Sequence, residues 1–188
     1  MLETLKELDT QLFLYLNHKH SVGWDIFMEF CTDKKAWIPL YAVILIVLFR
    51  HFKVRVIFVL IAIGATIACA DLFASGFCKP FFERLRPCHE PELEGLVHIL
   101  ARGCGGSFGF ISSHAANTFG LATILVLLTK KQYTYVWLFY LWAAIVSYSR
   151  IYIGVHYPSD IIVGALSGIM WAYIVFAFYK KLIPSHLR

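Results

Sequence analysis

The stretch SRIYIGVHYPSDIIVGALSGIMWAYIVFAFY, residues 149–179, joins a short polar segment to a long apolar one. Residues 161–179 contain no Asp, Glu, Lys or Arg. This apolar run has about the 20-residue length that a helix needs to cross the hydrocarbon core of a membrane. The polar segment before it holds an arginine, a histidine and a carboxylate close to the expected membrane boundary. The stretch therefore predicts a membrane-spanning helix with reactive groups near its first turn.

The rest of the chain repeats this apolar character. Three further stretches lack Asp, Glu, Lys and Arg, namely residues 56–70, 103–129 and 132–149. Charged residues make up 15% of the 188 residues, well below the roughly 25% of soluble domains. A soluble fold has no use for so many apolar runs in so short a chain, so we expect one membrane-embedded domain over residues 1–188.

The fold class that follows is all-α, a polytopic helical membrane bundle. Five transmembrane helices are expected, over residues 36–49, 56–78, 113–129, 133–152 and 158–179. Residues 23–31 are apolar but too short to cross a membrane alone. Together with part of the N-terminal segment they would make a further span, so the bundle is expected to have five or six transmembrane helices.

The N-terminal segment carries Glu3, Glu7 and Asp9, which interrupt any apolar core of a signal peptide. Leucines recur there every three or four residues, the spacing of one helix face. They are Leu2, Leu5, Leu8, Leu12 and Leu16. The pattern predicts an N-terminal amphipathic helix that either lies on the membrane surface or packs on the bundle.

Basic residues orient the chain. The net charge is +5, but the basic residues sit at membrane boundaries, so we expect no nucleic-acid partner. Three segments carry Lys and Arg without Asp or Glu, which marks the cytoplasmic side. Their basic residues are Arg50, Lys53, Arg55, Lys130, Lys131, Lys180, Lys181 and Arg188. The long loop at residues 79–111 is then expected on the periplasmic or exterior side.

Polar residues meet at that outer face if the spans alternate in direction. They are Lys79, Arg86, Ser112, Ser113, His114, Ser149, Arg150, His156 and Asp160. A phosphoryl group in transfer spreads negative charge over its oxygens, and fixed cations stabilise it. Arginines grip phosphate oxygens bidentately, and helix N-termini bind anions through free backbone N–H groups. Ser112 or Ser113 is a natural N-cap for the third span. A phosphate-binding pocket between helix ends is therefore expected.

His156 and Asp160 share a helix face, because they are four residues apart. A neutral histidine attacks phosphorus if one ring nitrogen is aimed at it, and the carboxylate fixes the tautomer by accepting the proton of the other. His114, on another helix, is then free to act as general acid for the leaving group.

The same residues resemble the motifs of the type 2 phosphatidic acid phosphatase (PAP2) family. Lys79 to Pro87 reads K-x6-R-P, like the first motif, and Ser149 to Asp160 reads S-R-x5-H-x3-D, like the third. The second motif is usually P-S-G-H, and residues 111–114 read I-S-S-H, so its Pro and Gly do not match.

The resemblance implies a helical membrane bundle and a phosphatase that works through phosphohistidine without a metal or other cofactor. It assigns phosphate binding to Lys79, Arg86, Ser112, Ser113 and Arg150, and catalysis to His156, His114 and Asp160. The chain looks like the short bacterial members, which are enzymes of the inner (plasma) membrane with an outward-facing site. Their substrates include undecaprenyl pyrophosphate, which we favour, phosphatidylglycerol phosphate and the phosphates of lipid A. The oligomeric state stays open.

Two other classes of function compete with this interpretation. A transporter or flippase would bind a lipid phosphate without cleaving it, but it would need no aimed nucleophile. A metallohydrolase would use His114, His156 and Asp160 as metal ligands, but the nearby cations would repel a divalent ion.

Two features lie outside the motifs. Asp71, inside the second span, either supports the site or makes a helix–helix hydrogen bond. Cys88 and Cys104 both lie in the long loop, where an oxidising compartment would allow them to form a disulfide.

Overall fold

The computed structural model describes residues 2–100, 104–130 and 132–184, and no β-strand is assigned within these ranges. The α-helices are α1 (Leu2–Asn17), α2 (Val22–Thr32), α3 (Ile38–Phe52), α4 (Val56–Asp71), α5 (Lys79–Phe82), α6 (Ser113–Thr129), α7 (Leu138–Tyr152) and α8 (Pro158–Leu182). A π-helical segment, Leu72–Cys78, joins α4 to α5 without a break. Short 3-10 turns cover Lys34–Trp37, Lys53–Arg55, Pro87–His89, Pro91–Leu93 and Thr134–Trp137. The expected all-α class is confirmed.

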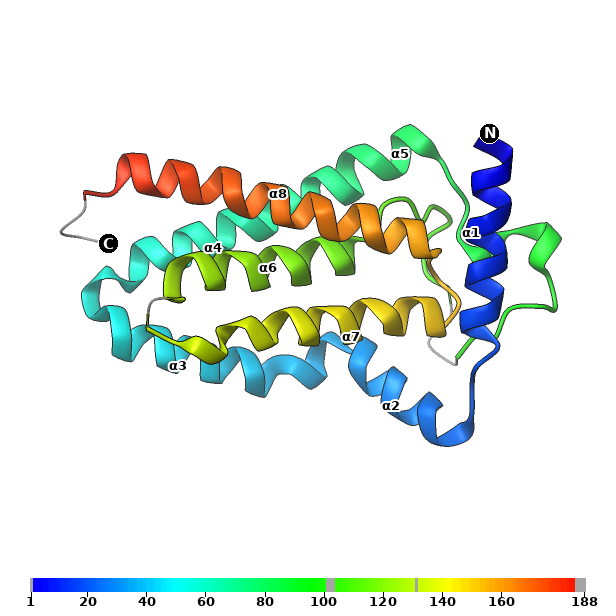
Figure 1. Ribbon diagram of the computed structural model, residues 1–188, viewed down its shortest axis with the longest axis horizontal. Helices are drawn as coiled ribbons and strands as arrows, with labels where there is room; N and C mark the ends of the chain where they lie inside the picture. Colours follow the sequence, from blue (N-terminus) through cyan, green and yellow to red (C-terminus); the bar gives the residue numbers. More distant parts are fainter. Residues whose placement is uncertain (1, 101–103, 131, 185–188) are drawn as a thin grey trace.

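The longer helices α3, α4, α6, α7 and α8 run along the long axis of the molecule, and α1 lies across one end of them (Figure 1). Among the described residues, two helical runs are long and apolar enough to cross a membrane, Lys34–Phe82 and Pro158–Leu182, and α6 is a shorter apolar helix. The first run turns back at Lys53, where φ is 51°, so α3 and α4 form an antiparallel pair. The first two expected spans thus belong to this one run, and the count of five or six spans stays a prediction.

The helices α6 and α8 pack backbone to backbone through small residues. A Cβ atom added at Gly168 would overlap the carbonyl oxygen of Ala116, and one added at Gly164 would lie 2.6 Å from that of Ser112. Gly120 faces the same contact, 3.3 Å from the Gly168 carbonyl oxygen by the same measure. Membrane helices approach this closely only where side chains are small. The contact fixes α6 and α8 relative to each other.

The helix α1 packs on the bundle, which is one of the two alternatives expected for it. Phe13 and Asn17 are fully buried against the bundle. The side chains on the leucine face that are exposed are Leu5, Leu8 and Leu12. The side chain of Leu2 lies outside the described residues. The helix is therefore packed on the bundle and keeps an apolar face turned outward.

The basic segments gather at the end of the bundle opposite α1 (Figure 1). They are the α3–α4 turn, the α6–α7 turn and the C-terminal end of α8. Lys131 and Arg188 lie outside the described residues. The common end agrees with the expected topology, and the side of the membrane that it faces stays a prediction.

Candidate functional site

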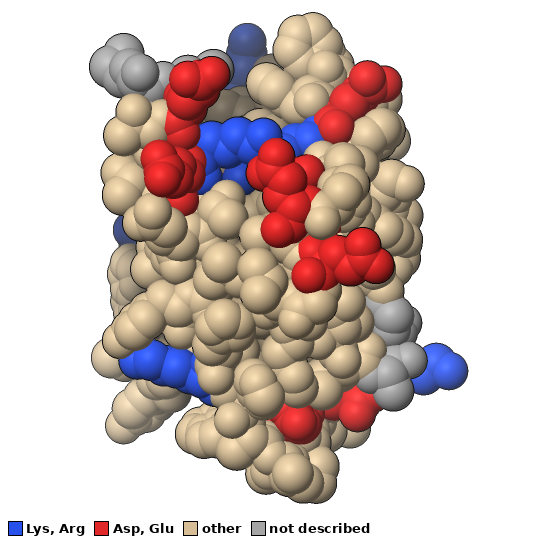
Figure 2. Space-filling model, turned by 90° about the vertical axis from the view of Figure 1, so that its right-hand side faces the viewer, with Lys and Arg blue, Asp and Glu red and all other residues tan. Residues whose placement is uncertain are grey.

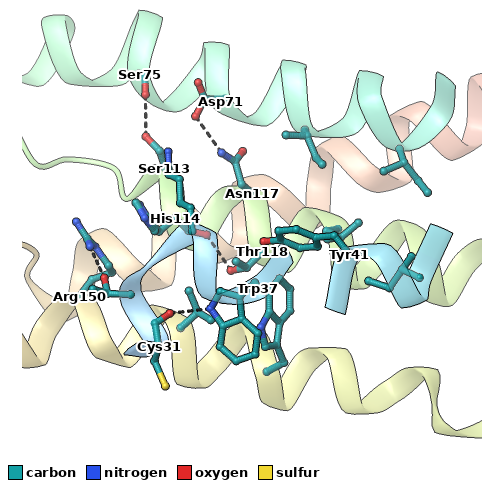
Figure 3. A pocket seen from close by; sticks show the side chains of 18 of the residues that line it. Cys31, Trp37, Tyr41, Asp71, Ser75, Ser113, His114, Asn117, Thr118 and Arg150 are labelled. Atoms are coloured by element: carbon teal, nitrogen blue, oxygen red, sulfur yellow. Dashed lines mark hydrogen bonds between the residues drawn. The ribbon is translucent and has the colours of Figure 1, made fainter. Parts of the chain in front are cut away.

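A cavity of about 660 Å³ opens between α3, α4, α6 and α7. Along α4 and its continuation, the lining changes from Leu60 and Ile63 to Asp71, Ser75 and Lys79. The polar part is completed by Arg86, Ser113, His114, Asn117, Arg150 and His156, and the apolar part by side chains that include Trp37, Tyr41, Leu48, Leu121 and Trp142 (Figure 3). One compartment therefore offers cations and histidines beside an apolar chamber.

His156 lies in the turn between α7 and α8, and only 2% of its surface is exposed. Its Nδ1 lies 3.2 Å from Oδ2 of Asp160. The same carboxylate oxygen accepts a hydrogen bond from the backbone N–H of Tyr157 at 3.0 Å. Pro158 occupies the first turn of α8, as expected, and so places Asp160 one turn after His156. With Nδ1 held by the carboxylate, Nε2 is the nitrogen left for chemistry in the cavity.

Gly109 covers this pair. A Cβ atom added there would lie 3.2 Å from both Cγ of Arg86 and Oδ2 of Asp160, and 3.5 Å from Nδ1 of His156. A side chain at this position would come unusually close to these atoms. Because Gly109 has no side chain, its backbone can pack directly over the His156–Asp160 pair.

The first turn of α6 enters the same cavity. Ser112 is the N-cap, and its hydroxyl accepts a hydrogen bond from the backbone N–H of Ala115 at 3.4 Å. Ser112 is fully buried and does not line the cavity, whereas Ser113 and His114 do. The backbone N–H of Ser112 donates to the carbonyl oxygen of Asp160 at 3.0 Å. The helix starts that carry His114 and Asp160 are thus joined directly.

The lysine and the two arginines reach the cavity from three directions. Nζ of Lys79 donates to Oγ of Ser113 at 2.9 Å. Arg86 is held from the loop side, since its Nε donates to the carbonyl oxygen of Phe108 at 3.2 Å. Arg150, on α7, hydrogen-bonds through Nη1 to the hydroxyl of Thr32 on α2 (Figure 3). Its Nε is buried without a hydrogen-bond partner in the part of the chain that the structure describes. Three cations therefore surround one space.

Burial and charge both act on the histidine. Burial lowers the pKa of His156 well below its usual value, and the surrounding cations, Arg150 first, add to this effect. The neutral ring, which is the nucleophilic form, is therefore favoured. Burial also lowers the pKa of Arg86, and the charge of Asp160 opposes that shift.

Arg84 and Asp9 belong to the site although the sequence did not single them out. Nη1 of Arg84 donates to Oδ1 of Asp160 at 3.0 Å and to Oγ of Ser159 at 2.7 Å. Its Nη2 donates to Oδ2 of Asp9 at 2.7 Å. The other oxygen of Asp9 accepts from the backbone N–H of Ser159 at 2.9 Å. The N-terminal helix is thus tied to the carboxylate that holds His156. A second arginine two positions before Arg86 was the only sequence signal.

Asp71 lies on the wall of the cavity. Its Oδ1 accepts a hydrogen bond from Nδ2 of Asn117 at 2.9 Å, which joins α4 to α6 (Figure 3). Of the two roles expected for Asp71, the helix–helix hydrogen bond is the one observed.

Cys88 and Cys104 form a disulfide, with their Cα atoms 6.0 Å apart, so the pairing expected in the long loop is confirmed. Nη1 of Arg86 donates to the carbonyl oxygen of Cys104 at 3.2 Å. The bond therefore fixes the backbone that holds a cavity arginine.

Figure 2 shows the end of the molecule that carries α1 and the long loop. Acidic side chains flank a short band of basic ones on this face. The visible part of this face therefore carries charges of both signs, whereas the cavity is lined by Lys79, Arg86 and Arg150.

Comparison with known proteins gives one family. A sequence model of the PAP2 superfamily matches residues 52–184. The chain is 42% identical to a lipid A 4′-phosphatase of Bacteroides thetaiotaomicron, over 97% of this chain and 81% of that protein. It is 33% identical to a lipid A 4′-phosphatase of Porphyromonas gingivalis, over 95% and 75%. The crystal structure of LpxE from Aquifex aeolicus superposes with a TM-score of 0.67 at 29% identity, over 90% of this chain and 95% of that one.

Proposed function

Because the chain belongs to the PAP2 superfamily and is a PAP2-type membrane phosphatase, we propose that it removes a phosphate group from lipid A, with His156 as nucleophile. The observation that carries the chemistry is the buried His156–Asp160 pair, whose histidine lines one cavity together with Lys79, Arg86 and Arg150. The observation that favours lipid A is the likeness to two lipid A 4′-phosphatases along almost the whole chain.

The reaction proceeds in two displacements. Nε2 of His156 attacks phosphorus, so an N–P bond forms and the bond from phosphorus to the lipid oxygen breaks. His114 donates a proton to that oxygen as general acid. Asp160 stabilises the positive charge on His156. Water then attacks phosphorus and gives a proton to His114, the N–P bond breaks, inorganic phosphate leaves, and both histidines are restored.

The cations hold the group in transfer. Arg86 and Arg150 offer paired N–H donors to two phosphate oxygens, and Lys79 supplies a point charge. Ser113 contributes its hydroxyl or the N–H at the start of α6. Ser112 acts through the helix it caps, since its hydroxyl is bonded to Ala115.

The apolar part of the cavity suits a lipid tail. Side chains such as Tyr41, Leu48 and Ile63 continue from the cations toward the middle of the helices. A lipid whose phosphate reaches His156 can place part of its acyl chains against them. The chain then acts as one membrane-embedded domain over residues 1–188, in the bacterial inner membrane, with this end facing the periplasm or exterior.

Three other interpretations are less well supported. The preference for undecaprenyl pyrophosphate is not supported, because two relatives that match along most of this chain are named lipid A 4′-phosphatases. A transporter that binds without cleaving is not favoured either, because relatives that match along most of this chain are named lipid A 4′-phosphatases. Metal binding by Asp160 is disfavoured, because the guanidinium of Arg84 lies 3.0 Å from Oδ1 of Asp160 and its positive charge would repel a cation there.

A substrate panel tests the proposal. Purified protein in detergent is given lipid A with both phosphates, phosphatidylglycerol phosphate or undecaprenyl pyrophosphate, each with excess chelator. We expect lipid A to lose one phosphate, the 4′ group, fastest. Faster hydrolysis of either other lipid would contradict the proposed substrate, and transport without phosphate release would contradict the reaction.

A further inference from the structure

A second cluster of histidine and carboxylate groups lies outside the cavity. His20 is in the connection between α1 and α2, Asp25 is in the first turn of α2, and His98 is in the long loop. One ligand atom from each lies within 4.8 Å of the others. Nε2 of His98 is 3.0 Å from Oδ1 of Asp25, and the rings of His20 and His98 stack with centroids 3.8 Å apart. Three chain segments thus direct potential ligands to one point.

Two of the three groups are held by the surrounding structure. The backbone of His98 is held by the side-chain amide of Asn17, which is fully buried. The N–H of His98 donates to Oδ1 of Asn17 at 2.8 Å, and the carbonyl oxygen of His98 accepts from Nδ2 of Asn17 at 3.1 Å. Oδ1 of Asp25 accepts a hydrogen bond from the hydroxyl of Tyr152 at 2.6 Å. Supporting bonds of this kind orient metal ligands in proteins.

The geometry is that of a small transition-metal site. Zinc binds histidine nitrogen and carboxylate oxygen at about 2.0–2.2 Å, so ligand atoms around a tetrahedral ion lie roughly 3.4 Å apart. The separation of 3.0 Å between His98 and Asp25 is already near this value. His20 is exposed, so its ring can turn from the stacked position to point its nitrogen at the same ion.

We propose that His20, Asp25 and His98 form a zinc-binding site at the α1 end of the protein, with water or a fourth group completing the coordination. Two imidazoles and one carboxylate favour zinc over calcium or magnesium, which prefer all-oxygen sites. The nearby group of Cys88, His89 and Cys104 offers no such site, because both sulfurs are joined in the disulfide.

A bound zinc ion would connect parts of the structure that support the active site. It would join α2 to the long loop, and through Tyr152 it would reach the end of α7, two residues after Arg150. Because zinc would bind the folded protein and join these segments, it should stabilise the fold. The same helix α2 also supplies Thr32 to Arg150.

The test is zinc titration of chelator-treated, full-length protein in detergent, followed by calorimetry and by the midpoint of thermal unfolding. We expect saturable one-to-one binding and a higher midpoint. His20→Ala, at an exposed position, and His98→Ala should each weaken binding by at least about tenfold. His51→Ala, at the opposite end, and His156→Ala, in the cavity, should bind as the unaltered protein does.

The inference is overturned if no saturable binding occurs or if His20→Ala binds zinc normally. It is also overturned if His156→Ala is the variant that loses binding, since the ion would then sit in the active site. None of these readouts depends on phosphatase activity.

Discussion

The two sides of the cavity are packed in different ways. On one side, α6 buries eleven of its seventeen residues and touches α8 backbone to backbone. On the other side, α3 buries one residue of fifteen, Leu48, and its side chains Tyr41, Ile44 and Leu45 line the cavity. Both helices are apolar, so hydrophobicity alone does not explain the difference.

The difference in packing fits the proposed function. The chemistry needs groups fixed to a fraction of an ångström, and His114, His156 and Asp160 all sit at the joined ends of α6 and α8. A lipid tail needs room and adaptable walls, and these are found where α3 and α4 face α6 and α7. In the proposed function, the close helix pair would position the reacting groups, and the open side would accommodate the lipid.

The largest effect is expected for His156→Ala. Removing a covalent nucleophile typically costs several orders of magnitude in rate, while the cations still hold the phosphate. We expect phosphate release to fall by about 10⁴-fold or more, with lipid binding retained. A turnover assay and a binding assay on the same preparation measure both, and His51→Ala serves as a matched control. Turnover within tenfold of the unaltered protein would refute the assignment.

The next effect concerns the close helix contact. Gly168→Ala places a methyl group against the carbonyl oxygen of Ala116 and should destabilise the protein by about 3 kcal/mol. Gly64→Ala, on α4, meets nothing within 4 Å and should be neutral. Thermal unfolding in detergent compares the two. Equal midpoints for the two variants would mean that the α6–α8 contact is not tight.

A smaller effect is expected from the N-terminal helix. Asp9→Asn keeps the size of the side chain but removes the charge that holds Arg84 against Asp160. Weakening such a bond by roughly 1.4 kcal/mol lowers kcat about tenfold, with KM little changed. Glu7→Gln, at an exposed position on the same helix, is the control. A change in unfolding temperature with kcat unaltered would show that Asp9 serves only to dock α1.

The smallest effect is on proton binding. Because burial lowers the pKa of His156, the ring should stay neutral below the usual value of about 6.5. At a pH between the lowered pKa of His156 in the folded protein and its usual pKa, the unfolded chain binds a proton that the folded protein does not. Stability should therefore rise with pH through this window and fall as the pH drops below about 6.5. Nitrogen NMR of labelled histidines, assigned with His156→Ala, measures this, and titration of His156 at or above 6.5 would contradict it.

The sequence predicted the parts of the site that are local. Three features follow from helix geometry: an N-cap at Ser112 or Ser113, of which the structure has Ser112, the proline at the start of α8, and the four-residue spacing of His156 and Asp160. The glycines four apart at Gly164 and Gly168 were also a readable signal for close packing. Each of these depends on a few neighbouring residues.

The remaining features depend on tertiary structure. Asp9 reaches Arg84 only because α1 lies across the end of the bundle, 75 residues away in sequence. Thr32 likewise contacts Arg150 only because the fold brings α2 next to α7, 118 residues away in sequence. The PAP2 match begins at residue 52, so both partners from the N-terminal part lie outside it. No periodicity or motif predicts where such a segment docks.

The central claim is that His156 carries the phosphate during turnover. The direct measurement is to mix the protein with lipid A, stop the reaction in base within milliseconds to seconds, and map phosphorylated peptides by mass spectrometry. We predict one phosphate on His156, more of it when water attack is slowed, and none in His156→Ala. Steady lipid A hydrolysis with no phosphopeptide, or with the phosphate on another residue, would contradict the mechanism.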